Sequence, residues 1–599
     1  MTAGSYTTST AFLEALAEAG VRYIFANLGS DHPGLNEALA QANADDRAAL
    51  AGGSGPSGSG VSPGGRVSPR GSRVPRIIVC PHETVALSAA HAYAMVTGEP
   101  QAVIVHVDAG TLNLGGVSNA MRGRVPVFIF AGAAPYTQEG ELPGGRNEFI
   151  HWIQDVRDQR GILRNYVKYD NEIRTGRNVK QLVHRALQIA RSEPAGPVYL
   201  TSPREVMEEQ VEPYTVDRAD FGPVAPVALT DTVTAEIATA LAQAQQPLIV
   251  TSYLGRDQAA VPKLVELCEL LAIPVLESMA YHVNFPADHP LHAGFQYHTV
   301  AQNPVLGKAD VILVIDSDVP WIPVVNRPSA GAAIYYVDVD PLKSQMSMWH
   351  VPARRFATAS SRLAVEQITR FVRENILIDA AVEVRRIEVT EASQARRAAL
   401  DALEQPGSDD VITAEYLTAC VRRLLADEDA LILTEVVTSS KTVADHLRPS
   451  RPGSVIHHGG GSLGWAGGAA VGAKLAAPDR TVVCLVGDGS FLFGVPSSAQ
   501  WAARRYGTPA LTVIYDNRGW AAPRFSTLQV HPDGAAAKAD DFNVSLEPEA
   551  DLPGVARAAG GAYGVTVSDP GELPRVLKDA LAIVHGGRSA VVSVHLPPV

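Results

Sequence analysis

The strongest constraint on the fold of this 599-residue chain is the alternation of short apolar runs with helical patterns. Runs such as 101–107 and 125–132 have the length of buried strands, and segments with helical periodicity, such as 82–98, lie between the runs. Strand–helix–strand repetition predicts parallel sheets that are covered by helices on both faces. The pattern restarts near residues 246 and 430. The sequence therefore predicts an α/β protein with three doubly wound domains.

Polar, proline-containing segments between the repeats set the expected limits of the domains. One segment of the first domain, about 46–74, fits none of the repeats, because 17 of the 22 residues in 52–73 are Gly, Ser or Pro. Such a composition buries too little apolar surface to offset its ordering entropy, so it predicts a disordered insertion. The expected divisions are an N-terminal domain over 1–208, a central domain over 228–375, a linker over 376–409 and a C-terminal domain over 410–599.

The charge and hydropathy of the chain argue against two classes of partner. The chain has 63 acidic and 50 basic residues, a net charge of −13, whereas nucleic-acid-binding surfaces carry a basic excess. It has no run of 18 apolar residues and no basic leader, so we expect no membrane span and a cytoplasmic location. The four cysteines, Cys80, Cys268, Cys420 and Cys484, are too scattered for a metal site or a disulfide framework.

Two polar motifs follow predicted strands of the C-terminal domain, GDGS at 487–490 and DNRGW at 516–520. The carboxyl ends of strands in open α/β sheets are where ligands bind. The Asp488 carboxylate, the Asn517 amide and the Gly519 carbonyl offer the oxygen ligands that Mg²⁺ or Ca²⁺ prefers. Glycines let a phosphate group approach the backbone closely. We therefore expect a divalent cation here that bridges to a diphosphate.

A glycine pattern upstream offers an alternative. Gly459, Gly461 and Gly464 match GxGxxG, the pattern of dinucleotide-binding loops. The acidic residue that such a site needs about 20 positions later falls on the GDGS motif itself. The dinucleotide interpretation is therefore disfavoured.

The two motifs together resemble the thiamine-diphosphate fingerprint, which begins GDG and ends in a pair of asparagines. Glu83, in the run CPHETVALSAAHAYA, resembles the glutamate of the family's pyrimidine-binding domain. The chain is thus similar to the pyruvate decarboxylase/acetolactate synthase superfamily, whose domain order is pyrimidine-binding, central and diphosphate-binding. Three further matches resemble benzoylformate decarboxylase, namely NLGS at 27–30, HVDAGTLN at 106–113 and FQYHT at 295–299.

The resemblance implies roles for individual residues. Glu83 would hydrogen-bond N1′ of the cofactor, while Gly461 would offer its carbonyl to N4′ and Leu463 would support the cofactor from below. His106 and His298 would be an acid–base pair, and Ser30 would hold the substrate carboxylate; Asp31 and His32, which follow Ser30, are further pocket candidates. The remaining implied contacts with cofactor or metal come from Gly487, Asp488, Gly489, Ser490, Asn517, Gly519 and Trp520.

The implied function is a lyase dependent on thiamine diphosphate and Mg²⁺ that decarboxylates a 2-oxo acid and can also ligate aldehydes. An acetolactate-synthase-like carboligase that joins two 2-oxo acids and can carry FAD is the alternative, and a catalytically silent paralogue is a third. The histidine pair favours the decarboxylase, so FAD is not expected. Because Glu83 and the GDGS motif lie in different domains, the resemblance implies a homodimer or homotetramer with active sites at the subunit interface.

Overall fold

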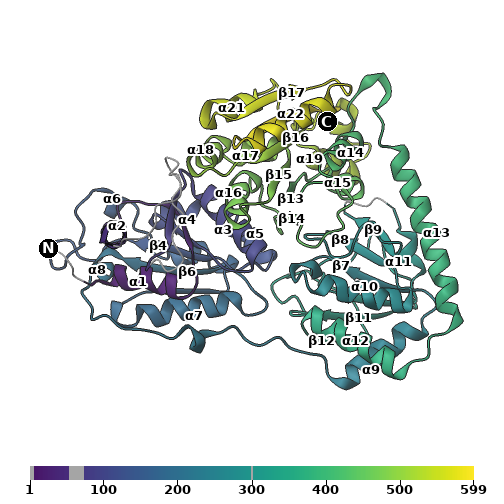
Figure 1. Cartoon of the computed structure of the whole chain (residues 1–599), viewed down its shortest axis with the longest axis horizontal. Coiled ribbons are helices and arrows are strands. Elements are labelled where there is room, and N and C mark those ends of the chain that lie inside the picture. Colours follow the sequence, from purple (N-terminus) through teal and green to yellow (C-terminus); the bar gives the residue numbers. More distant parts are fainter. Residues whose placement is uncertain (1–5, 53–72, 298–300, 599) are drawn as a thin grey trace.

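The computed structural model describes residues 6–52, 73–297 and 301–598. They form three six-stranded sheets in which all paired strands are parallel, with helices between most successive strands (Figure 1). The predicted α/β class with three doubly wound domains is confirmed. His298 and residues 53–72 of the predicted insertion lie outside the described residues. Residues 46–52, which the prediction also placed in the insertion, form the end of helix α2.

The N-terminal sheet has the strand order β2-β1-β3-β4-β6-β5. Its strands are β1 (Tyr23–Asn27), β2 (Arg76–Val79), β3 (Ala102–Val105), β4 (Phe128–Ala133), β5 (Tyr169–Glu172) and β6 (Val198–Pro203). The α-helices of this domain are α1 (Thr8–Glu18), α2 (Pro33–Gly52), α3 (Glu83–Thr97), α4 (Val107–Leu112), α5 (Val117–Arg122), α6 (Ile150–Ile153), α7 (Val179–Arg191) and α8 (Arg204–Met207).

The central sheet, in the order β9-β8-β7-β10-β11-β12, has the arrangement of dinucleotide-binding α/β folds. Its strands are β7 (Pro247–Thr251), β8 (Val275–Ser278), β9 (His292–Gln296), β10 (Val311–Ile315), β11 (Ala333–Asp338) and β12 (Arg355–Thr358), with helices α9 (Asp231–Gln243), α10 (Ala260–Leu271), α11 (Pro304–Lys308) and α12 (Ser361–Asn375). The segment expected to be a linker contains α13 (Ala380–Ala402), which runs along the right side of Figure 1 towards the C-terminal domain.

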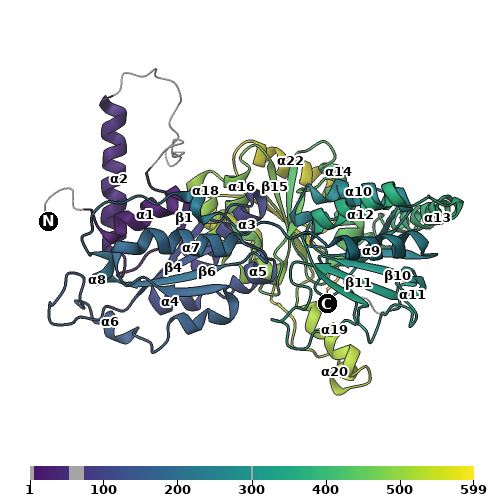
Figure 2. The same cartoon turned by 90° about the horizontal axis from the view of Figure 1, so that it is seen from below.

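The C-terminal sheet has the order β14-β13-β15-β16-β18-β17 and so repeats the connectivity of the N-terminal sheet. Its strands are β13 (Ala430–Glu435), β14 (Val455–His457), β15 (Thr481–Gly487), β16 (Leu511–Asp516), β17 (Tyr563–Val567) and β18 (Ala590–His595). The α-helices are α14 (Ala414–Leu424), α15 (Ser440–Leu447), α16 (Ala466–Ala476), α17 (Asp488–Phe493), α18 (Pro496–Tyr506), α19 (Ala521–Val530), α20 (Ala535–Ala539), α21 (Leu552–Gly560) and α22 (Leu573–His585). Helices α19 and α20 project from the body of the chain (Figure 2).

The N-terminal and C-terminal domains are joined by the crossing of α3 and α16 (Figure 1). A Cβ atom on Gly472 would lie 1.9 Å from the carbonyl oxygen of Ala89, and one on Gly468 would lie 2.8 Å from that of Val85. Glycine is therefore required at both positions, because the two helix backbones approach closely there. This packing fixes the helix that begins with Glu83 against the helix that follows Leu463.

Two further features of the chain are the state of its cysteines and the hydropathy of its helices. All four cysteines are buried and free. None of the helices in the described part of the chain is long and apolar enough to cross a membrane.

Candidate active site

Glu83 lies at the carboxyl edge of the N-terminal sheet, four residues after β2 and at the start of α3. It is only 6% exposed. Its carboxylate accepts hydrogen bonds from Asn27 Nδ2 at 2.9 Å and from Asn113 Nδ2 at 3.2 Å. Two neutral amides therefore hold this buried acid in place.

His106 lies at the same edge, directly after β3. Its Nδ1 is 2.5 Å from Asp31 Oδ1, and Asp31 Oδ2 accepts from the backbone N–H of Val107 at 3.0 Å. Val107 has φ of +27°, which a β-branched residue rarely adopts, so the contacts around His106 hold the backbone in a strained conformation. Such strain is typical of functional sites.

The contact between His106 and Asp31 changes the protonation of both groups. The hydrogen bond to Asp31 outweighs partial burial and raises the pKa of His106. Burial would raise the pKa of Asp31, but the charge of His32 and the hydrogen bond from His106 hold it well below its usual range. Asp31 therefore stays ionised and favours the protonated form of His106.

Ser30 follows β1 at this edge and is linked to a buried polar chain. Its Oγ lies 3.4 Å from Nε2 of His151, and NH1 of Arg204 lies 3.0 Å from the same Nε2. The N-terminal sheet thus gathers Glu83, Ser30, Asp31 and His106 at one edge. His298, the predicted partner of His106, lies outside the described residues.

Asp488, Asn517 and Gly519 converge at the carboxyl ends of β15 and β16. The Asn517 amide oxygen faces Asp488 Oδ1 at 3.3 Å and the Gly519 carbonyl oxygen at 2.9 Å; turning the amide over would let its nitrogen donate to both. Three oxygen acceptors that face one another form a donor set suited to a hard divalent cation. Burial raises the pKa of Asp488 to about 6. The predicted metal ligands are therefore in mutual contact and fit such an ion.

One glycine of the GDGS motif, Gly489, makes room for a neighbouring side chain. A Cβ atom on Gly489 would lie 2.6 Å from the ring of Trp520, so only glycine fits against this indole. Ser490 is buried beside it at the start of α17, while Gly487 ends β15.

The loop between β14 and α16 holds Gly461 and Leu463. Glu435, at the end of β13, accepts from the backbone N–H groups of Gly464 at 2.5 Å and Ala466 at 2.8 Å. Asn119 of the N-terminal domain donates to the Ser462 carbonyl at 2.8 Å and accepts from its N–H at 3.0 Å. A Cβ atom on Gly461 would meet no atom within 4 Å, so the space beside this anchored loop is open.

The sequence patterns do not identify Glu435 as a candidate. Burial raises the pKa of this carboxyl group to about 7. The only signal for it is an acidic residue that ends an otherwise apolar strand. His151 and Arg204 were also missed, because nothing near them in the sequence resembles a motif.

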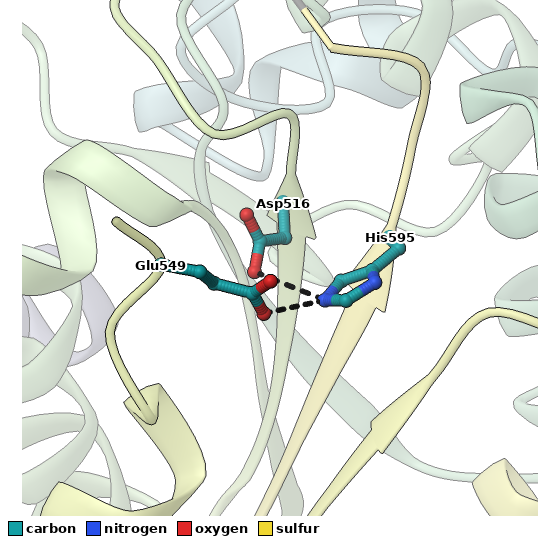
Figure 3. Close-up of side chains that lie close together, drawn as sticks. All are labelled: Asp516, Glu549 and His595. Atoms are coloured by element: carbon teal, nitrogen blue, oxygen red, sulfur yellow. Dashed lines mark hydrogen bonds and ion pairs between the residues drawn. The ribbon is translucent and has the colours of Figure 1, made fainter. Parts of the chain in front are cut away.

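A second cluster of possible ligands lies beside the predicted metal site (Figure 3). His595 Nε2 lies 2.7 Å from Glu549 Oε1 and 3.9 Å from Asp516 Oδ2. Asp516 Oδ2 also accepts from Ser593 Oγ at 2.8 Å. The side chain of Asp516 therefore takes part in an ion-pair cluster with His595 and Glu549, whereas the next residue, Asn517, faces Asp488.

Comparison with known families identifies all three domains. The N-terminal TPP binding domain of thiamine pyrophosphate enzymes matches residues 68–162, the central domain matches 234–358 and the C-terminal TPP binding domain matches 435–594. These matches support thiamine diphosphate as the cofactor.

Individual relatives agree with the domain matches. Benzoylformate decarboxylase of Pseudomonas aeruginosa is 27% identical over 523 residues, which cover 85% of this chain and 90% of that protein. Acetolactate synthase isozyme 3 large subunit of Escherichia coli is 24% identical over 531 residues, 86% of each chain. The structure of the thiamine diphosphate-dependent 4-hydroxybenzoylformate decarboxylase of Rhodococcus jostii RHA1 superposes with a TM-score of 0.75 at 22% identity, over 99% of this chain and 100% of that one. The chain belongs to the thiamine pyrophosphate enzymes, with their N-terminal, central and C-terminal domains in that order.

Proposed function

We propose that the protein is a thiamine-diphosphate- and Mg²⁺-dependent lyase that decarboxylates a 2-oxo acid without oxidation and can ligate the product to an aldehyde. The observation that carries the proposal is the pairing of His106 with buried Asp31 at the sheet edge that also presents Glu83. This arrangement places a group able to hold a proton beside the residue that would bind the cofactor.

The residues of both terminal domains fit the cofactor. Asp488, Asn517 and Gly519 would hold Mg²⁺, with the diphosphate against 487–490 and Trp520, while Glu83 would hydrogen-bond N1′ of the pyrimidine ring. Gly461 and Leu463 would contact the cofactor from the anchored loop. When bound, thiamine diphosphate supplies the nucleophilic carbon and the electron sink that decarboxylation needs.

The substrate side of the site belongs to the N-terminal sheet. The Ser30 hydroxyl would donate a hydrogen bond to the carboxylate of the substrate. Because Nδ1 of His106 faces Asp31, Nε2 is the nitrogen that would deliver a proton to the reacting carbonyl oxygen or carbon. Asp31 keeps the imidazole in that tautomer and orientation.

We propose that two subunits complete each site, as a homodimer or a pair of dimers. The segment that carries His151 also exposes large apolar side chains, with Phe149 90% and Ile153 77% exposed, as expected of a surface that a partner covers. Light scattering should show a dimer or larger species at micromolar concentration. A monomer would contradict a shared site.

The acetolactate-synthase-like alternative is favoured by one cavity. It measures about 690 Å³ and lies between the N-terminal and central domains, and this volume is within the range of cofactor sites. The arginines of its lining are already paired with acids, Arg191 with Glu99, Arg256 with Glu193 and Arg362 with Asp257. The crevice after β7, where central sheets of this order bind dinucleotides, is instead filled by Tyr253, which donates to Asp338 at 3.1 Å. A flavin absorption band in the purified protein would favour this alternative over the decarboxylase.

Incubation with Mg²⁺, thiamine diphosphate and a panel of aromatic, branched, short and acidic 2-oxo acids tests the proposal. Release of CO₂ from at least one acid is expected. Absence of turnover across the panel, with the cofactor shown to be bound, would support the silent paralogue instead.

A further inference from the structure

Arg204 is a buried cation that lacks an acidic partner. It follows β6 directly and is only 7% exposed. Its NH1 donates to Asn147 Oδ1 at 3.0 Å and to His151 Nε2 at 3.0 Å, while Nε has no hydrogen-bond partner. Among the side chains that the structure describes, no carboxylate oxygen lies within 4.0 Å of an Arg204 nitrogen, the limit for an ion pair. A buried charge is normally paired with an opposite charge, so an anion bound beside Arg204 would be stabilised.

The neighbouring acids are engaged elsewhere. Glu205 Oε1 accepts from the backbone N–H of Thr137 at 2.8 Å and from its hydroxyl at 2.7 Å. Burial raises the pKa of Glu208, and Arg204 only partly opposes that rise from a distance. Asp31 is held by His106 and His32. Arg146, the other arginine of this corner, is paired with Asp155.

Arg204 also lies on the substrate side of the proposed site. The strand order β2-β1-β3-β4-β6 places Glu83, Ser30, His106 and Arg204 in that order along one sheet edge. His151 links Ser30 with Arg204 across this row, because its Nε2 faces both Ser30 Oγ and Arg204 NH1. Helices α6 and α8 lie together at this end of the domain (Figure 2). A substrate whose carboxylate is held at Ser30, and which extends away from Glu83, reaches the guanidinium.

We propose that Arg204, together with His151 and Asn147, binds a second acidic group of the substrate, so that the substrate is a 2-oxo acid with an anionic side chain. This inference rests on the proposed function. The Nε–NH2 edge of the guanidinium, which donates to no described residue, matches the two oxygens of a carboxylate, phosphonate or sulfonate. Burial and the charge of Arg204 lower the pKa of His151, so its Nε2 can accept from NH1 of Arg204 and orient the guanidinium with little added charge.

Two substrates of equal length test the inference in the wild-type holoenzyme. 2-Oxoglutarate ends in a carboxylate, and 2-oxopentanoate ends in a methyl group. We expect kcat/KM for the diacid to exceed that for the monoacid by roughly 100-fold, since a site built to pair a polar group rejects an analogue that lacks it. Equal values, or a preference for the monoacid, would overturn the inference.

Variants separate substrate binding from a structural role of Arg204. Arg204→Gln should raise KM for 2-oxoglutarate by roughly 100-fold, with little change in kcat or in kcat/KM for 2-oxopentanoate, and Arg204→Lys should restore part of the loss. Arg174→Gln, at an exposed arginine of the same domain, is the matched control. Equal losses for both substrates would show that Arg204 only pins the 147–151 segment.

Binding measurements with acids that cannot react test the acidic subsite independently of the proposed decarboxylase activity. Calorimetry with glutarate and pentanoate, which lack the oxo group and cannot be decarboxylated, should show tighter binding of the diacid to wild type and the same weak binding of both to Arg204→Gln. If no 2-oxo acid reacts but glutarate is preferred, the proposed function fails and the acidic subsite stands. Equal binding of the two acids to wild type would contradict the subsite, whatever the activity.

Discussion

Asp31 Oδ1 lies 2.5 Å from His106 Nδ1, although the two residues are 75 positions apart in the sequence. The contact exists because β1 and β3 are adjacent parallel strands, so that the loops after them meet at one edge. The side chain of Asp31 is shielded from solvent, whereas that of His106 is 22% exposed. The buried carboxylate can therefore act on the reaction only through the imidazole, which makes Asp31 a positioning residue.

Asp31→Asn should shift the pH dependence of turnover. In the wild type Asp31 raises the pKa of His106, so its removal leaves burial, which lowers that pKa. The protonated form of His106 is then lost at a lower pH, and the alkaline limb of the kcat/KM profile should move to lower pH. Asp158→Asn, at an exposed aspartate of the same domain, should leave the profile unchanged. An unshifted profile in Asp31→Asn would show that His106 is not the titrating acid.

Glu83→Gln should lose activity without losing the fold. Glutamine keeps the size of the side chain and one acceptor for Asn27 or Asn113, but it cannot exchange a proton with N1′ of the cofactor. We expect CO₂ release to fall by at least about 100-fold, as for the loss of a general acid–base group, with the melting temperature close to that of wild type. Glu99→Gln, just beyond the other end of α3, serves as the control. Activity retained in Glu83→Gln would refute the proposed role of this residue.

The sequence predicts where the candidate residues lie in the fold better than it predicts their contacts. Apolar runs locate the strands, and strand ends carry Asp488, Asn517 and His106, because side chains there are free to face a ligand. The contact of Asp31 with His106 depends on which strands are neighbours in the sheet, and the contact of Arg204 with His151 depends on how a long loop folds back. Hydrophobic periodicity predicts neither the strand order nor the path of a loop. The helical end of α2 was assigned to the insertion because the neighbouring Gly- and Ser-rich segment dominated its composition.

Asp488→Asn should have opposite effects on cofactor binding and on the stability of the protein without metal. The asparagine can donate a hydrogen bond to the Asn517 amide oxygen, which in the wild type faces the acceptor oxygens of Asp488 and Gly519. The melting temperature of the apoprotein should therefore hold or rise. Removal of the charged group from the proposed metal site should weaken Mg²⁺-dependent binding of thiamine diphosphate, as a chelator should in the wild type.

Calorimetry with Mg²⁺ and thiamine diphosphate, together with thermal melting of the apoprotein, measures both effects of Asp488→Asn. Asp533→Asn, at an exposed aspartate of the same domain, is the control. Cofactor binding equal to that of wild type would place the metal elsewhere, and the cluster of Asp516, Glu549 and His595 would then be the next site to test.

Gly472→Ala should disturb the site from a distance. The added methyl group would lie 1.9 Å from the carbonyl oxygen of Ala89, and that backbone atom cannot move unless α3 shifts on α16. Overpacking of this kind costs about 1–3 kcal/mol, which exceeds the ~1 kcal/mol that alanine gains over glycine in a helix. Since α3 begins with Glu83 and α16 follows Leu463, turnover should fall together with the free energy of unfolding. Gly331→Ala, in a turn where a Cβ atom would meet nothing within 4 Å, is the control for a methyl group added without a clash. If Gly472→Ala melted at or above the wild-type temperature, the close approach of the two helices would not be what joins the N-terminal and C-terminal domains.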